Sequence, residues 1–310
     1  MTANGAGPAI RVCGLTKDYG RGRGVFDVSL EVAAGEVLGF LGPNGAGKTV
    51  TMRHLMGFIK PQKGKVEILG HDCFLERPRV QARLGYLPGE SACMQEMTAR
   101  SFLDLMAGMR GMRDRSRMLE LADAFGLDLG ARIGRMSKGN RQKAAIVVAF
   151  MARPDVLLLD EPTSGLDPLM QERFLDLVAE ERSRGAAVLL SSHIFEEVGR
   201  ACDRVAFIRA GRVAMTCAMD EVRSMRGRGY SVEFSSARER SRWELAHGDE
   251  PAEGEARGVE LRDVRDVNAL IRELSSYDVA SVTSREQTLE ELFLHLYEGV
   301  EPCGKPRGFR

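Results

Sequence analysis

One glycine-rich segment of the chain has the residue types that hold a phosphate group. It reads GPNGAGKT, from Gly42 to Thr49, and fits the phosphate-loop pattern GxxxxGK[ST] between a predicted strand and a predicted helix. Its glycines let the backbone curl so that N–H groups point at a phosphate, and the helix start adds a positive dipole end. Lys48 would place its charge at the β- and γ-phosphates of a nucleotide, and the Thr49 hydroxyl would ligate Mg²⁺. The residues predicted to contact the nucleotide here are Gly42, Pro43, Asn44, Gly45, Ala46, Gly47, Lys48, Thr49 and Val50.

A second segment, VLLLDEPTSGLDP from Val156 to Pro168, places two carboxylates at the end of an apolar run. If the run is a buried parallel strand, its carboxyl end lies at the sheet edge where such folds bind ligands. Asp160 is then predicted to hold Mg²⁺ directly or through water. Glu161 is predicted to orient or deprotonate the water that attacks the γ-phosphate.

The elements that must position these residues follow from the apolar patterns. Short apolar runs predict buried strands, and longer periodic stretches predict helices, in the alternation that is typical of an α/β domain over about Ile10 to Ala218. Asp167-Pro168 is a helix start, with the Asp as cap and the Pro at the first helical position. The predicted strands are Val37–Leu41, Val156–Asp160 and Ala187–Ser191; the predicted helices follow Gly47 and cover about Thr98–Met109, Asn140–Met151 and Pro168–Arg184.

The bulk composition limits the class of protein. The 310 residues are 44% hydrophobic and 28% charged, as in a soluble globular protein, and the net charge of zero gives no field for nucleic acid or an anionic membrane. The six cysteines form no CxxC pair, so neither a disulfide framework nor a zinc site is indicated. We find no membrane-spanning apolar run and no secretory signal, and therefore expect a protein that stays inside the cell.

The character of the chain changes near Asp220, which predicts two domains, 1–219 and 220–310. The second is predicted to be a small α+β domain with strands Tyr230–Phe234, Gly258–Leu261 and Val279–Thr283 and helices Val264–Leu274 and Leu289–Tyr297. Between the first two strands, the charged stretch ARERSRWELAHGDEPAEGEARG is predicted to be a solvated loop or linker.

The order of GPNGAGKT, MSKGNRQK, LLLDEPTSGLD and SSH resembles the nucleotide-binding domain of ABC transporters over about Ile10 to Met215. The resemblance implies a phosphate-loop α/β ATPase domain, with a RecA-like core, an antiparallel β subdomain and a helical subdomain that carries the signature segment. It also implies a dimer that sandwiches ATP and Mg²⁺, formed by two copies or with a homologous ATPase.

Individual residues match motifs of this family. MSKGNRQK resembles the signature segment, so Ser137 and the Gly139 N–H are expected to contact the γ-phosphate held by the opposite subunit. Tyr19 stands where the family stacks an aromatic ring on adenine. His193 matches the switch histidine that reaches the γ-phosphate, and Asp167 matches the acidic residue that communicates across the dimer.

The chain also departs from the family pattern. Val50 stands where the family often has a second hydroxyl. The absence of that hydroxyl removes one side-chain hydrogen bond to phosphate, which would contribute about 1–3 kcal/mol. Gly89, with Glu90 beside it, replaces the glutamine that senses metal and water. Lys138 and Asn140 replace the usual signature residues, and the Lys138 ammonium either approaches a phosphate or points to solvent.

The C-terminal segment SREQTLEELFLHLYEG is similar to the tails of ATP-binding subunits in ABC-2 type and daunorubicin-resistance exporters. This implies a separate membrane permease, docked around Gly85–Gln95, that exports a drug or hydrophobic compound, with this chain cytoplasmic and peripheral on the inner face of the membrane. Two alternatives remain: a soluble ABC ATPase on ribosomes or DNA, and a phosphate-loop GTPase or kinase. The 18 acidic against 14 basic residues after Asp220 disfavour nucleic acid, and the signature disfavours a GTPase or kinase.

Overall fold

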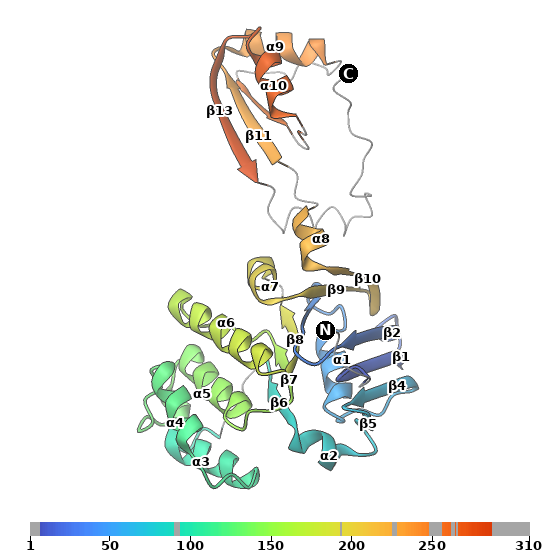
Figure 1. The fold of residues 1–310 in the computed structure, drawn as a ribbon, viewed down its shortest axis with the longest axis vertical. Coiled ribbons are helices and arrows are strands. Elements are labelled where there is room, and N and C mark those ends of the chain that lie inside the picture. Colours follow the sequence, from blue (N-terminus) through green and yellow to red (C-terminus); the bar gives the residue numbers. More distant parts are fainter. Residues whose placement is uncertain are drawn as a thin grey trace. The chain divides into compact units, whose positions relative to one another are not determined.

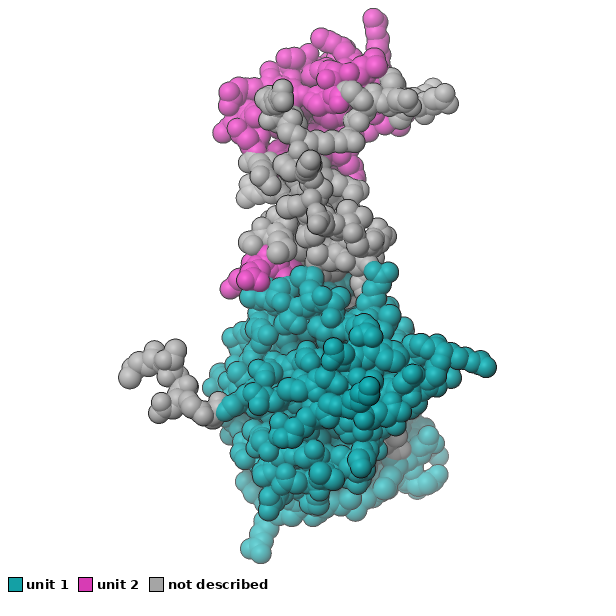
Figure 2. Space-filling model, turned by 90° about the vertical axis from the view of Figure 1, so that its right-hand side faces the viewer, with its two compact units in different colours: residues 1–219 teal, residues 220–310 magenta. Residues whose placement is uncertain are grey.

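The computed structural model describes residues 7–89, 94–192, 194–224, 228–247, 256–261, 264 and 266–286. The chain divides into two units, Met1–Met219 and Asp220–Arg310, which are coloured separately in Figure 2.

Within the described residues, a six-stranded sheet forms the centre of the first unit, in the order β10-β9-β3-β8-β7-β6. Strand β10 is antiparallel to β9, and the other neighbours are parallel. Every residue of β3, β7 and β8 is buried, because helices and a second sheet cover both faces, which confirms the strands predicted from continuous apolar runs. The strands are β3 (Val37–Leu41), β6 (Leu84–Leu87), β7 (Val156–Asp160), β8 (Ala187–Ser192), β9 (Arg204–Arg209) and β10 (Arg212–Ala218).

A smaller antiparallel sheet, in the order β2-β1-β4-β5, lies beside the first (Figure 1). Buried and exposed residues alternate over most of β2, as expected for a strand with one face on the core and one in solvent. The strands are β1 (Ile10–Asp18), β2 (Gly24–Val32), β4 (Lys63–Ile68) and β5 (His71–Asp72).

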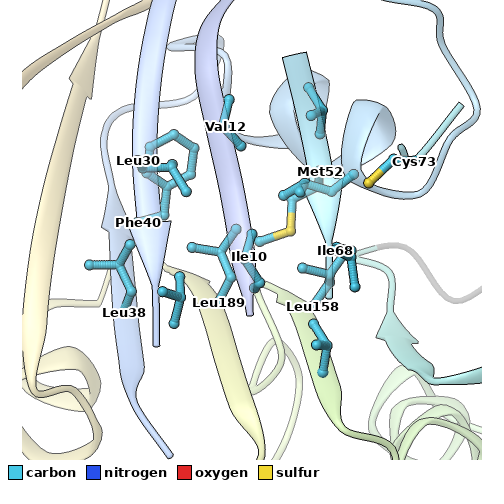
Figure 3. Close-up of a cluster of buried hydrophobic side chains, with 14 of the residues drawn as sticks. Ile10, Val12, Leu30, Leu38, Phe40, Met52, Ile68, Cys73, Leu158 and Leu189 are labelled. Atoms are coloured by element: carbon cyan, nitrogen blue, oxygen red, sulfur yellow. The ribbon is translucent and has the colours of Figure 1, made fainter. Parts of the chain in front are cut away.

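Helix α1 (Lys48–Leu55) is held in the core between these two sheets. Figure 3 shows Met52 of α1 among Ile10 of the antiparallel sheet and Phe40, Leu158 and Leu189 of the parallel sheet. Each such side chain contributes about 1.5–3 kcal/mol when fully buried. The start of α1, and the loop that precedes it, are therefore fixed by a cluster of buried apolar side chains that includes Ala46, Met52 and Leu55.

Helices α3, α4 and α5 pack together as a group beside the parallel sheet (Figure 1). The helix start predicted at Asp167 and Pro168 is confirmed, since Asp167 accepts a hydrogen bond from Met170 N with Pro168 next to it. Helix α3 is capped by Thr98, which accepts from Ser101 N, a cap that the sequence analysis did not identify. Helix α5 begins at Lys138, two residues before the predicted start, because Ser137 caps it by accepting from Asn140 N. The helices are α2 (Arg77–Ala82), α3 (Ala99–Met109), α4 (Ser116–Ala124), α5 (Lys138–Phe150), α6 (Pro168–Ser183) and α7 (Phe195–Ala201). None of the helices in the described ranges has both the length and the apolar composition to span a bilayer.

The second unit contains an antiparallel sheet in the order β12-β11-β13. The side chains of Val232, Phe234, Trp243 and Leu270 form its core. Its elements are β11 (Arg228–Phe234), α9 (Ala237–Ala246), β12 (Gly258–Leu261), α10 (Val267–Leu274) and β13 (Val279–Glu286), and helix α8 (Met219–Ser224) spans the division between the units.

The predicted loop after β11 is wrong over its first half, because ARERSRWELA forms helix α9. Ser236 caps this helix by accepting from Glu239 N, and Trp243 is only 4% exposed, with its ring 6.2 Å from that of Phe234. Helix α10 begins at Val267 and not at Val264, since Asp266 accepts from the N–H groups of Asn268 and Ala269. The predicted helix Leu289–Tyr297 lies outside the described residues.

Candidate active site

The phosphate loop connects β3 to α1, and two of its glycines are required by close approach. Gly47 has φ of 115°, and a Cβ there would lie 2.8 Å from Val25 Cγ1. A Cβ at Gly42 would lie 2.3 Å from the backbone oxygen of Ile208. Side chains at these positions would therefore displace β2 or β9, and glycine avoids both clashes. The first turn of α1, all of which is described, holds no acidic residue, so the positive end of the helix is not neutralised there.

Lys48 is 5% exposed and bends back under the loop. Its Nζ donates to the backbone oxygens of Gly42 at 2.6 Å and Pro43 at 3.3 Å, and lies 3.9 Å from Glu161 Oε1. Burial lowers the pKa of Lys48, and the charges of Glu161 and Asp160 oppose that shift. A buried ammonium that contacts two neutral carbonyls is suited to bind an anion, so these residues fit a nucleotide phosphate.

Asp160 lies at the end of β7, is 3% exposed, and accepts hydrogen bonds from two hydroxyls. Thr49 Oγ1 donates to its Oδ2 at 3.0 Å, and Ser191 Oγ at the end of β8 donates to its Oδ1. Among the described residues there is no group of three or more His, Cys, Asp and Glu side chains that could hold a metal. Mg²⁺ does not need one, since it usually binds one or two carboxylates together with phosphates and water. The Thr49 and Asp160 oxygens therefore fit this cation.

Ser191 is a site residue that the sequence reasoning missed. The SSH segment was selected for its histidine, and the first serine was given no role. The available signal was the position of Ser191 at the end of a strand, next to the strand that ends in Asp160.

Glu161 has an unusual backbone conformation. Its φ is 47°, in the left-handed region that costs a non-glycine residue about 1–3 kcal/mol. Its N–H donates to Ser191 O at 3.0 Å, and its side chain is 28% exposed. The turn directs the carboxylate toward Lys48 and leaves it in reach of solvent, as a group that handles water requires.

Two of the residues singled out in the sequence, His193 and Glu90, lie outside the described residues. Ser192 and Ile194, on either side of His193, are described. Gly89, which precedes Glu90, is also described and lies against Asp160, since a Cβ at Gly89 would be 3.3 Å from the Asp160 backbone oxygen. The position of the missing glutamine therefore faces the proposed metal ligand.

Tyr19 lies in the turn between β1 and β2, and the residue is 46% exposed. Its N–H donates to Arg23 O at 2.9 Å, and Lys17 Nζ lies 5.7 Å from the ring centre. Strand β2 begins at Gly24, whose oxygen would be 3.4 Å from a Cβ at Gly47. The structure thus places the Tyr19 turn next to the phosphate loop, with the tyrosine exposed.

Ser137 and Gly139 lie at the start of α5, beside the loop that follows Glu161. A Cβ at Gly139 would be 2.4 Å from the Gly165 oxygen, so the two backbones are in direct contact. Lys138 Nζ donates to Ser164 Oγ at 2.7 Å, and Gln142 Nε2 donates to Pro162 O at 2.7 Å. The Lys138 side chain, for which the sequence left two orientations open, therefore ends on Ser164.

The chain is similar to known proteins over most of its length. A family model described as ABC transporter matches residues 25–164, which include the phosphate loop, Ser137, Gly139 and Glu161. The chain is 34% identical over 306 residues to a daunorubicin resistance ATP-binding protein of Streptomyces coeruleorubidus, covering 94% of this chain and 96% of the relative. It is 32% identical over 303 residues to a bacitracin transport ATP-binding protein of Bacillus licheniformis, covering 94% and 97%. A solved ATP-binding subunit of an ABC transporter matches the fold with a TM-score of 0.65 at 31% identity, covering 70% of this chain and 92% of that one.

Proposed function

The chain belongs to the ATP-binding proteins of ABC transporters, and from that membership we propose that it powers export of a drug or hydrophobic compound through a separate membrane permease. As a member of this family it binds and hydrolyses ATP. The relatives named for resistance to daunorubicin and for bacitracin transport support a cargo of this class.

The observation that carries the proposed chemistry is the convergence of Lys48, Thr49, Asp160 and Glu161 at the carboxyl ends of β3 and β7. We assign Lys48 to the β- and γ-phosphate oxygens and Thr49 and Asp160 to Mg²⁺. The cation, when bound, would neutralise charge on the phosphates. Glu161 orients the attacking water and accepts its proton, because its carboxylate is partly open to solvent and lies near the buried ammonium.

Two further residues complete the proposed nucleotide site. Tyr19 stacks on the adenine, since its exposed ring lies in the turn next to the phosphate loop. His193 acts at the γ-phosphate, which its place directly after β8 supports, because Ser191 at the end of that strand already contacts Asp160.

The active form we propose is a dimer, of two copies or of one copy with a homologous ATPase. Ser137 is exposed at the start of α5, whose first turn is fully described and holds no acidic residue. An exposed helix start of this kind is suited to bind an anion. In the proposed dimer, Ser137 and the Gly139 N–H contact the γ-phosphate held by the other subunit.

The permease is proposed to dock on the surface around Gly85–Gln95, where the described Met94 side chain is 53% exposed. This docking would hold the chain in the cytoplasm on the inner face of the membrane. Nucleic acid is not an expected partner, since the chain has zero net charge.

The dimer and its chemistry are tested together by Glu161→Gln. An amide cannot accept the proton of water, so this variant should bind ATP and lose turnover by about 100-fold or more. It should then elute as a dimer from gel filtration when ATP and Mg²⁺ are present. Asp176→Asn, an exposed change on α6, is the matched control and should hydrolyse ATP normally. Turnover of Glu161→Gln close to that of the unchanged protein would remove Glu161 as the base.

The partner is tested by purification from membranes. A polytopic membrane protein should co-purify with the tagged chain, and no RNA or DNA should do so. Recovery of ribosomes or nucleic acid in place of a membrane protein would favour the alternative of a soluble ABC ATPase.

A further inference from the structure

A single buried carboxylate joins the two segments that carry the proposed catalytic residues. Glu197 lies in α7 and is 6% exposed. Its Oε1 accepts a hydrogen bond from Thr163 Oγ1, and its Oε2 accepts one from Ser192 Oγ at 3.1 Å. Each oxygen of the carboxylate therefore accepts a hydrogen bond from a different segment, one in the loop after β7 and one at the end of β8.

The first of these segments is the loop that follows the Asp160–Glu161 pair. Thr163 is two residues after Glu161 and is 2% exposed, so its hydroxyl is fixed inside the protein. The same loop is bound at Pro162 by Gln142 of α5. Glu161 itself has a left-handed backbone, and such a conformation persists only when the surrounding structure holds it. The contact to Thr163 is one of the restraints close enough to do so.

The second segment contains His193. Ser192 Oγ donates to Glu197 and also accepts the N–H of Ile194 at 2.9 Å. The residues on both sides of His193 are thus tied to the same carboxylate, one directly and one through the Ser192 hydroxyl. Burying a carboxylate costs free energy that these hydrogen bonds offset, and an apolar side chain of similar size would leave both hydroxyls without this partner.

We propose that Glu197 is a positioning residue for ATP hydrolysis. Its carboxylate fixes the segment of Glu161 and the segment of His193 relative to each other. This inference rests on the proposed roles of those two residues. Glu196 precedes Glu197 on the same helix and is exposed, so it offers a matched control.

The kinetic test compares Glu197→Ala, Glu197→Gln and Glu196→Ala in the full chain. Because small displacements of catalytic groups lower rates strongly, Glu197→Ala should lower kcat by about 10- to 100-fold and change the dissociation constant of ATP less than about threefold. Glu197→Gln should keep kcat within about fivefold of that of the unchanged protein. The reason is that the glutamine amide can accept a hydrogen bond from one hydroxyl and donate one to the oxygen of the other. A kcat within about twofold of the unchanged protein for Glu197→Ala would overturn the proposal. The proposal would also be overturned if Glu197→Ala and Glu197→Gln lost kcat, ATP affinity and thermal stability to the same extent.

A double-mutant cycle checks that Glu197 acts through the two hydroxyls. Thr163→Val combined with Glu197→Ala should lower kcat by less than the product of the two single effects, because both changes remove the same contact. Ser192→Ala with Glu197→Ala should behave in the same way. Effects that multiply in both cycles would contradict the assignment.

A measurement without nucleotide separates this inference from the proposed function. In Glu197→Ala, amide hydrogen exchange should accelerate in residues 161–167 and 192–194, and it should be unchanged in the second unit. Unchanged exchange in both segments would overturn the positioning role even if the protein hydrolyses ATP. Absence of ATP hydrolysis in the unchanged protein, with accelerated exchange in the variant, would instead overturn the proposed function.

Discussion

Helices α1 and α5 both begin with a glycine-containing segment suited to bind phosphate, but their surroundings differ. Lys48 at the start of α1 is 5% exposed, is bonded to its own loop, and stands on a helix held between two sheets. Ser137 and Lys138 at the start of α5 are exposed, and their neighbouring contacts are made to the loop 161–167.

The phosphate loop at the start of α1 is thus enclosed within the subunit, whereas the start of α5 lies at its surface. The phosphate loop has a buried charge, a hydroxyl and two carboxylates gathered around it. At the start of α5, Ser137 and Lys138 are exposed, as we expect for a site that a second subunit completes. Four experiments test whether the two helix starts differ in this way.

The largest effect is expected for Lys48→Ala. Hydrogen bonds to charged groups contribute roughly 1.5–3 kcal/mol each, so loss of the ammonium should weaken ATP binding by about 100-fold or more. Arg53→Ala, an exposed basic residue on the same helix, is the control and should change affinity less than about twofold. Unchanged affinity of Lys48→Ala in a nucleotide titration would remove the phosphate-loop assignment.

Ser137→Arg should spare ATP binding by the monomer and abolish most ATPase activity, because the side chain would block the surface offered to the other subunit. The arginine also removes the helix cap, which costs about 1 kcal/mol. Ser137→Asp is the companion variant, since aspartate keeps a cap and places a negative charge toward the partner's phosphate. Mixed with Lys48→Ala protein, either variant should recover part of the activity, since the heterodimer contains one intact composite site. No recovery, with heterodimers shown to form, would argue against a shared site.

A smaller effect is expected for Lys138→Ala. If the ammonium serves only Ser164, then Lys138→Ala and Ser164→Ala should lower ATPase activity equally, by about threefold or less, because an exposed hydrogen bond contributes little. If it instead reaches a phosphate in the dimer, Lys138→Ala should lower activity more than Ser164→Ala and raise the KM for ATP. Steady-state kinetics of the two variants distinguishes these outcomes.

The smallest effect on nucleotide binding is expected from deletion of the second unit. A chain that ends at Ser224 keeps helix α8 and all described residues of the proposed site, so its affinity for ATP should change less than about twofold. If the second unit contributes to the dimer, ATPase activity of the truncated chain should fall at low protein concentration and return as concentration rises. An insoluble fragment, or one that does not bind ATP, would show that the two units depend on a common core.

The sequence predicted those features that depend on local pattern. Strands β3 and β7 were placed to the residue because a continuous apolar run can be satisfied only in a covered sheet. The start of α6 followed from Asp167 and Pro168. The convergence of Lys48, Thr49, Asp160 and Glu161 followed from a phosphate loop and an acidic strand end in one parallel sheet.

Features that depend on tertiary contacts were not predicted. Helix α9 has a strongly charged sequence, and Trp243 is buried in a core that combines strand β11 with helix α10, which lies further along the chain. The hydrogen bonds of Ser191 to Asp160 and of Lys138 to Ser164 join residues 31 and 26 positions apart. No local pattern specifies such pairs, because each exists only after the sheet and the helices have packed.

The backbone of Glu161 places two requirements on one position. Its φ of 47° costs an L-residue with a Cβ about 1–3 kcal/mol, and glycine would adopt it without that cost. Replacing Glu161 by glycine would relieve that backbone strain, but it would also remove the carboxylate that lies 3.9 Å from the buried Lys48 ammonium and that we assign to turnover. A laboratory selection for thermostability alone does not act on turnover at this site, so directed evolution of this ATPase has to score turnover in every round.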